Sequence, residues 1–211
     1  MKYLCLILVL IVSCAKKETI KIGDVIFREP ITTSQLSEAI NEVTQTQKVT
    51  NYTHMGICFI ENDSVKVIHS DADLGVVIQS LQVFLQPEDS TTYFADVYRI
   101  NQLESAQASK AISNAKALIG QPYNTTYIFE DEGYYCSEFV YEAFKDHQVF
   151  QLEPMTFKDP KTNQFHEGWI SHYKALNIEI PEGKLGCNPN GMANNMHLTL
   201  VKSFRNWLIK Y

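Results

Sequence analysis

A cysteine begins an amphipathic segment in the stretch Gly133-Tyr134-Tyr135-Cys136-Ser137-Glu138-Phe139-Val140. Apolar residues recur with the spacing of one helix face, at Phe139, Val140, Ala143 and Phe144. We therefore expect Cys136 in the first turn of a helix. There, free backbone N–H groups and the helix dipole make a thiol more acidic and can stabilise the oxyanion formed when it attacks a carbonyl. A small buried residue at a helix start is the alternative explanation.

Two histidines are candidates for the base that a cysteine nucleophile needs. His54 begins the apolar strand His54–Ile60, in which Gly56 leaves room near its ring, and His69 ends the next strand, Val65–His69. A hairpin of this length places both rings on one face, within the error of the register. We expect His69 to form one hydrogen bond that fixes the tautomer of His54. Taken alone, either histidine is equally explained as a strand-end residue that bonds to the backbone.

The rest of the chain mixes short strands with a few helices, which predicts an α+β domain. Ser34 can cap one helix, and Gly120 lies where a left-handed C-terminal cap would follow another. The segment Gly186–Asn195 is interpreted as a loop. The patterns indicate further strands at Lys21–Phe27, Gly75–Ile78, Phe94–Ile100 and His197–Phe204, and helices at Ser34–Thr44 and Leu103–Ile119.

The N-terminus has the layout of an export signal. Lys2 precedes an apolar run, Tyr3–Val12, that is too short for a membrane-spanning helix of ~20 residues. The sequence Ile11-Val12-Ser13-Cys14 resembles a lipobox, which implies cleavage before Cys14 and lipidation of this residue. We therefore expect a signal peptide at 1–13, a lipidated tether at 14–20 and one domain at 21–211, in a protein exported and anchored to the cell membrane. An ordinary signal peptide with an incidental cysteine is the alternative.

Composition narrows the classes of partner and cofactor. The net charge is −6, and no cluster of basic residues indicates nucleic-acid binding. Three cysteines follow Cys14, so at least one thiol is free or pairs outside the chain; a bridge between Cys58 and Cys187 stays open. The remaining histidines have no metal-ligand spacing with the cysteines, and we expect neither a metal nor a cofactor. The oligomeric state stays open.

Four motifs together resemble the YiiX/YebB-like branch of the circularly permuted NlpC/P60 papain-like hydrolases, which are often exported lipoproteins. The motifs are Gly23-Asp24-Val25-Ile26-Phe27, Thr53-His54-Met55-Gly56-Ile57, Gly120-Gln121-Pro122-Tyr123 and Tyr134–Val140. The match covers roughly residues 20 to 145, and the order His before Cys is the permuted one. The resemblance implies an antiparallel sheet or barrel packed against helices.

The resemblance also assigns roles to residues. Cys136 matches the nucleophile and His54 the general base. His69 occupies the place of the third polar residue, where the family pattern is loosest. Tyr123 matches a tyrosine that lies beside the oxyanion site in relatives; a packed loop aromatic is the alternative. The expected reaction is acyl transfer through an acyl-enzyme.

Three functions remain to be distinguished. The first is a cell-envelope amidase or peptidase acting on peptidoglycan-derived peptides or small acyl-amino acid compounds. The second is a lipid acyl hydrolase or acyltransferase of the same permuted class, although those relatives carry Asn-Cys-Glu-His where this chain has Tyr-Cys-Ser-Glu. The third is a binding lipoprotein without activity, which the presence of Cys136, His54 and His69 disfavours.

Overall fold

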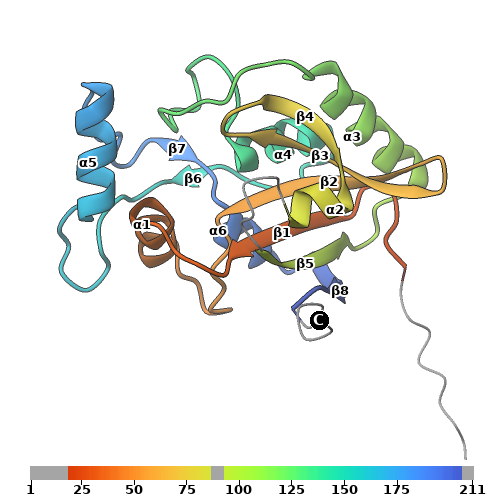
Figure 1. The fold of residues 1–211 in the computed structure, drawn as a ribbon, viewed down its shortest axis with the longest axis horizontal. Coiled ribbons are helices and arrows are strands. Elements are labelled where there is room, and N and C mark those ends of the chain that lie inside the picture. Colours follow the sequence, from red (N-terminus) through yellow and green to blue (C-terminus); the bar gives the residue numbers. More distant parts are fainter. Residues whose placement is uncertain (1–18, 87–92, 206–211) are drawn as a thin grey trace, which may run out of the picture.

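An antiparallel sheet organises the computed structural model, which describes residues 19–86 and 93–205 (Figure 1). The strand order is β4-β3-β2-β1-β5-β8, and each neighbouring pair is antiparallel. The strands are β1 (Val25–Pro30), β2 (His54–Glu61), β3 (Ser64–Asp71), β4 (Gly75–Ser80), β5 (Tyr93–Ile100) and β8 (Leu198–Ser203). The sheet confirms the expected α+β class.

Helices cover both faces of this sheet, and strand β2 contributes to both cores. Helices α3 (Ser105–Ala117) and α4 (Cys136–Phe144) pack on one face, where Met55 and Ile57 point. The short helix α2 (Leu81–Leu85) covers the other face, where Cys58 packs. Alternate residues of a strand point to opposite faces, so His54 shares the side of Cys58.

A smaller layer lies beyond one end of the sheet (Figure 1). There α1 (Gln35–Val43) packs on α5 (Glu167–Leu176) around Phe157, Trp169 and Tyr173. The two-stranded sheet of β6 (Glu153–Pro154) and β7 (Leu185–Gly186) leads from this layer to α6 (Pro189–Ala193). A 3-10 turn, η1 (Lys145–His147), follows α4. Within the described ranges no helix is both long and apolar enough to cross a membrane.

Most expected elements are present, with three corrections. The first strand begins at Val25 and not at Lys21, because residues 22 and 23 form a turn in which Gly23 has φ +83°. The segment Gly186–Asn195 is wrongly predicted as a loop, since it holds α6, which Asn188 caps through the Gly191 N–H. Helix α5 was not predicted. The signal peptide and Cys14 lie outside the described residues.

Asn190 fixes helix α6 against the strand layer. Its side chain is fully buried, and its Oδ1 accepts from the Tyr52 N–H at 2.9 Å and the Thr50 hydroxyl at 2.8 Å. Its Nδ2 donates to Thr44 Oγ1 at 2.7 Å and to the Tyr52 carbonyl at 3.2 Å. One side chain therefore satisfies groups on three residues of the stretch 44–52, which is remote in sequence from α6.

We expect Asn190→Ala to lower the free energy of unfolding by about 2 kcal/mol or more, because several buried polar groups lose their partners. Urea denaturation of the purified domain measures this. Asn194→Ala, at the exposed end of the same helix, is the matched control and should change stability by less than about 0.5 kcal/mol. Equal effects of the two substitutions would contradict the role given to Asn190.

Candidate active site

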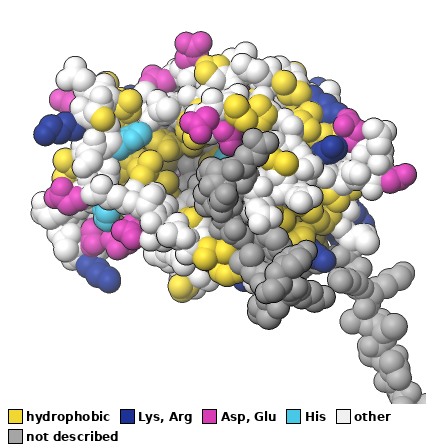
Figure 2. Space-filling view, viewed as in Figure 1, with side chains coloured by type: hydrophobic (Ala, Val, Ile, Leu, Met, Phe, Trp, Pro, Cys, Tyr) yellow, Lys and Arg dark blue, Asp and Glu magenta, His cyan; other side chains and the backbone are white. Residues whose placement is uncertain are grey.

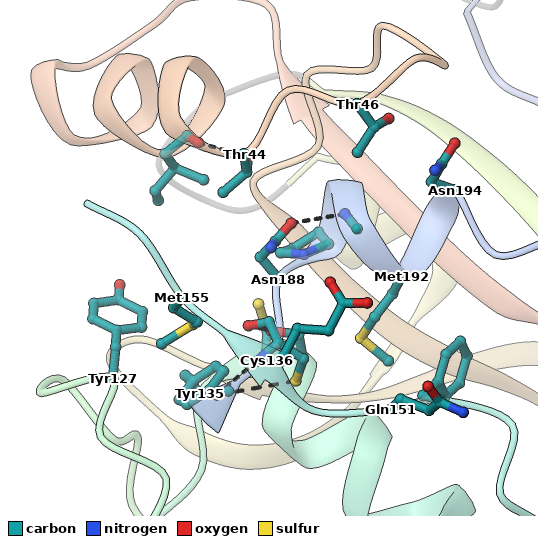
Figure 3. A pocket seen from close by; sticks show the side chains of 18 of the residues that line it. Thr44, Thr46, Tyr127, Tyr135, Cys136, Gln151, Met155, Asn188, Met192 and Asn194 are labelled. Atoms are coloured by element: carbon teal, nitrogen blue, oxygen red, sulfur yellow. Dashed lines mark hydrogen bonds between the residues drawn. The ribbon is translucent and has the colours of Figure 1, made fainter. Parts of the chain in front are cut away.

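A pocket of about 600 Å3 opens beside the first turn of α4. Its walls come from the end of α1, the loop 121–135, α5 and the segment 186–197. Cys136 and Tyr127 line it (Figure 3), and so do Tyr123 and Cys187. The first helical turn of α4 therefore faces a concave space large enough for a small substrate.

Cys136 begins α4 as expected, but its thiol is more deeply buried than the sequence indicated. The side chain is 4% exposed. Burial raises the pKa of the thiol to about 11, although backbone N–H groups of Met55, Ser137 and Cys136 and the charge of Arg28 oppose the rise. The expectation of a more acidic thiol is therefore wrong for the free protein: desolvation outweighs the helix terminus, and Cys136 is a neutral thiol at neutral pH.

The residues beside Cys136 tie its helical turn to two other segments. Glu138 accepts the Tyr135 N–H at 3.1 Å and the Asn124 side-chain amide at 3.2 Å, which holds the loop 121–135. The Ser137 hydroxyl donates to the Cys187 carbonyl at 3.0 Å, and the Cys187 N–H donates to Tyr135 Oη at 3.2 Å. These bonds hold the backbone of both pocket walls against the nucleophile.

His54 and His69 meet on one face of the hairpin, as expected. His54 Nε2 lies 2.8 Å from His69 Nδ1, and His69 Nε2 lies 3.0 Å from Gln79 Oε1 on β4. Gly56 makes the space: a Cβ there would lie 2.9 Å from His69 Cβ. The amide oxygen of Gln79 only accepts, so His69 carries its proton on Nε2 and His54 donates from Nε2. His54 Nδ1 is left as an acceptor.

Both rings are neutral in this arrangement. Burial lowers the pKa of His54 well below its usual range, and the charges of Arg28 and His69 add to the effect. Burial and Arg28 also lower the pKa of His69 to about 4, against the hydrogen bond to Gln79. A neutral His54 with a free Nδ1 is the form that a general base requires.

The structure brings the backbone beside His54 near Cys136, whereas the His54 ring points to the α2 side of the sheet and Cys136 packs on the α4 side. The Met55 N–H, directly after His54, bonds to the Cys136 sulfur, and Thr53, directly before it, lines the pocket. The two side chains, although both are described, form no hydrogen bond with each other, and the His54 ring packs against Phe84. Catalytic hydrogen bonds are often long in a free enzyme and shorten when substrate binds.

Tyr123 lies against the nucleophile. Burial raises the pKa of its phenol well above the usual range, with further contributions from Tyr127 and Cys136, and a hydrogen bond from the Cys136 backbone N–H opposes the rise. The phenol oxygen therefore lies beside the amide that would form half of an oxyanion site. The family resemblance implied this position for Tyr123, and its role at an oxyanion site stays a prediction.

Two features of the site were missed or left open. Gln79 was missed because the predicted strand ended one residue before it. The described cysteines Cys58, Cys136 and Cys187 are all free thiols, and the open question of a bridge is answered, since Cys58 packs on the opposite side of the sheet from the other two.

Known proteins resemble this chain along most of its length. Residues 19–202 match the family model described as "Permuted papain-like amidase enzyme, YaeF/YiiX, C92 family". Uncharacterized protein YiiX of Escherichia coli (strain K12) is 30% identical over 125 residues, which are 59% of this chain and 57% of that relative. The match thus spans just over half of the relative's length.

A solved structure shares the fold. It is the crystal structure of metalloprotein yiiX from Escherichia coli O157:H7, with a TM-score of 0.68 and 24% sequence identity over 86% of this chain and 96% of that chain. Its title refers to a metalloprotein. Among the residues that the structure describes in this chain, no three His, Cys, Asp or Glu side chains are grouped so that they could hold a metal ion.

The buried neutral histidines predict a pH dependence of stability. The pKa of His69 is about 4 in the folded protein and ~6.5 in an unfolded chain. Between these values the unfolded state binds more protons, so the free energy of unfolding falls as the pH falls. Burial raises the pKa of Glu138 to about 8, which acts in the opposite direction over the same range, so a variant comparison is needed.

We expect His69→Gln to remove about 2 kcal/mol of the change in unfolding free energy between pH 7 and pH 5. Urea denaturation at both pH values measures it. His197→Gln, an exposed histidine, is the control and should leave the pH dependence as it is in the unchanged protein. An unchanged pH dependence in His69→Gln would show that this ring is not held neutral.

Proposed function

The chain belongs to the permuted papain-like amidase family of the YaeF/YiiX type, and we propose that it cleaves an amide bond with Cys136 as nucleophile and His54 as base. Membership of this family carries the permuted papain-like fold, as the resemblance indicated, and a cysteine hydrolase activity. The observation that supports the assigned residues is the hydrogen-bonded series Gln79–His69–His54, which leaves Nδ1 of His54 free to accept a proton.

The reaction then begins from an uncharged Cys136 thiol and an uncharged His54 imidazole. We propose that the His54 ring turns toward the pocket when substrate binds, and that the Cys136 proton then moves to His54 Nδ1 as the sulfur bonds to the amide carbon, because neither group is charged beforehand. The His54 imidazolium gives this proton to the leaving nitrogen, and the carbon–nitrogen bond breaks to leave a thioester on Cys136. His54 next takes a proton from water, whose oxygen attacks the thioester, and returns a proton to the departing sulfur.

The oxyanion formed in each step needs hydrogen-bond donors. The Cys136 backbone N–H and the Tyr123 hydroxyl lie together at the start of α4. We propose that both turn to the substrate oxygen when it enters, since a preorganised pair of donors in a buried site stabilises a developing negative charge strongly. Tyr123 is thus assigned to the oxyanion site.

We propose two classes of substrate and one location. The amide belongs either to a peptidoglycan-derived peptide or to a small acyl-amino acid compound. The lipobox-like sequence at 11–14 supports export and attachment to a membrane through Cys14, which would place the enzyme in the cell envelope.

Cys136→Ala and His54→Ala should each lower the rate of enzyme acylation by p-nitrophenyl acetate at least about 100-fold, the usual contribution of a general base or more. Nitrophenol release and mass spectrometry of the acetylated protein measure this. Cys58→Ala, which changes a thiol on the other side of the sheet, should keep the rate. An acetyl group on Cys187 in place of Cys136 would contradict the assignment.

The role of Gln79 has its own test. Gln79→Leu removes the acceptor that fixes the tautomer of His69, and we expect acylation to slow by about 10- to 100-fold. Gln79→Glu keeps an acceptor and should retain more of the rate than the leucine variant. Nitrogen-15 chemical shifts of the imidazoles report the tautomers, and unchanged shifts of His54 and His69 in Gln79→Leu would refute the proposed series.

A further inference from the structure

The pocket has two different sides around the nucleophile. In Figure 3, Tyr127 and Met155 lie on one side of Cys136, and Gln151, Met192 and Asn194 lie on the other. A substrate whose carbonyl is at Cys136 therefore extends in two directions, with its acyl group on one side and its amine on the other. The polarity of the residues on each side of the pocket indicates the polarity of the substrate half that binds there.

The first side is apolar. Its wall comes from α1, the loop 121–135, the segment after β6 and α5, and includes the apolar or aromatic side chains Ile40, Val43, Tyr127, Met155, Phe157 and Trp169. Figure 2 shows hydrophobic side chains in the hollow beside α5. Tyr127 packs edge-on against Trp169 at 5.4 Å, and Trp169 against Phe157 at 5.0 Å, so the wall is already formed.

The second side offers uncharged hydrogen-bonding groups. Gln151 and Asn194 line it beside Met192, with amides that both donate and accept. Glu153 adds a carboxylate to the pocket. Within the described part of the chain, no lysine or arginine lines the pocket.

Arg28, whose positive charge lowers the pKa of Cys136, is buried outside the pocket. Arg28 is only 8% exposed. Its guanidinium lies 4.7 Å from the centre of the Phe84 ring and 4.2 Å from the centre of the Tyr93 ring. It also donates a hydrogen bond to the Phe84 carbonyl at 2.6 Å. It lies on the α2 side of the sheet and cannot meet a substrate carboxylate in the pocket.

We propose that the substrate is an amide of an apolar acyl group with an uncharged polar amine, the acyl group lying on Tyr127 and Met155 and the amine on Gln151 and Asn194. This inference rests on the proposed function and chooses between its two substrate classes. An acidic peptide would lose the hydration of its carboxylates without gaining a cation, and would face Glu153. Each methylene group buried on the apolar wall should improve binding by about fourfold.

A matched set of substrates tests both halves. Acetyl, butanoyl and octanoyl groups are each joined to glutaminamide, which is neutral, or to glutamate, and the released amine is measured by mass spectrometry. We expect kcat/KM to rise at least tenfold from acetyl to octanoyl and to be at least tenfold higher for glutaminamide than for glutamate.

Two variants link these ratios to the pocket. Met155→Gln should lower the octanoyl rate more than the acetyl rate, and Gln151→Arg should raise the relative rate of the glutamate amides. Leu185→Gln is the control, because Leu185 is an exposed apolar residue opposite Pro154 in the β6–β7 pair but does not line the pocket, and it should keep both ratios.

The outcomes separate this inference from the proposed function. Absence of Cys136-dependent acylation by p-nitrophenyl acetate overturns the function itself. An enzyme that is acylated but shows no preference for octanoyl, prefers glutamate, or cleaves none of these amides overturns only the substrate class.

Discussion

The first turn of helix α4 is the constraint on which the site depends. Four consecutive residues, Tyr135 to Glu138, each make a different connection: the Tyr135 phenol holds Cys187, Cys136 meets the Met55 amide, Ser137 bonds to Cys187 and Glu138 holds Asn124. A helix terminus has free N–H groups that must find partners. Here the partners include the Cys136 sulfur and the buried Glu138 side chain, so the same turn both begins its helix and positions the pocket walls.

Burial of this turn sets the electrostatics of the chemistry. Desolvation raises the pKa of Cys136 to about 11 and lowers the pKa of His54, so both changes favour the uncharged pair. A helix dipole and three backbone N–H groups oppose the effect on the thiol but do not reverse it. The free protein therefore holds Cys136 as a buried, uncharged thiol, and in the proposed mechanism the thiol loses its proton only as it attacks a substrate that also excludes water.

The sequence supplied the parts of the site that have local signals. Periodicity placed Cys136 at a helix start, and the hairpin of alternating residues placed His54 and His69 together, because a two-residue period and a short turn determine both. It did not show the depth of burial that raises the pKa of the thiol, since α3 and residues 187–193 close over the turn from distant parts of the chain. Gln79 likewise contacts His69 only through the register of β3 with β4.

The poorly predicted C-terminal third completes the pocket, and this explains why it was hard to interpret. Its helix α6 has five residues and too few apolar positions to show a period, so its conformation comes from contacts with other segments. The four hydrogen bonds of Asn190 are made to residues 44, 50 and 52, and Cys187 is held by residues 135 and 137. The residues assigned to catalysis come from strands β2 and β3 and the start of α4, whereas about a third of the pocket lining comes from the segment 186–197. Substitutions in that segment can therefore change specificity while the turn that carries Cys136 remains in place.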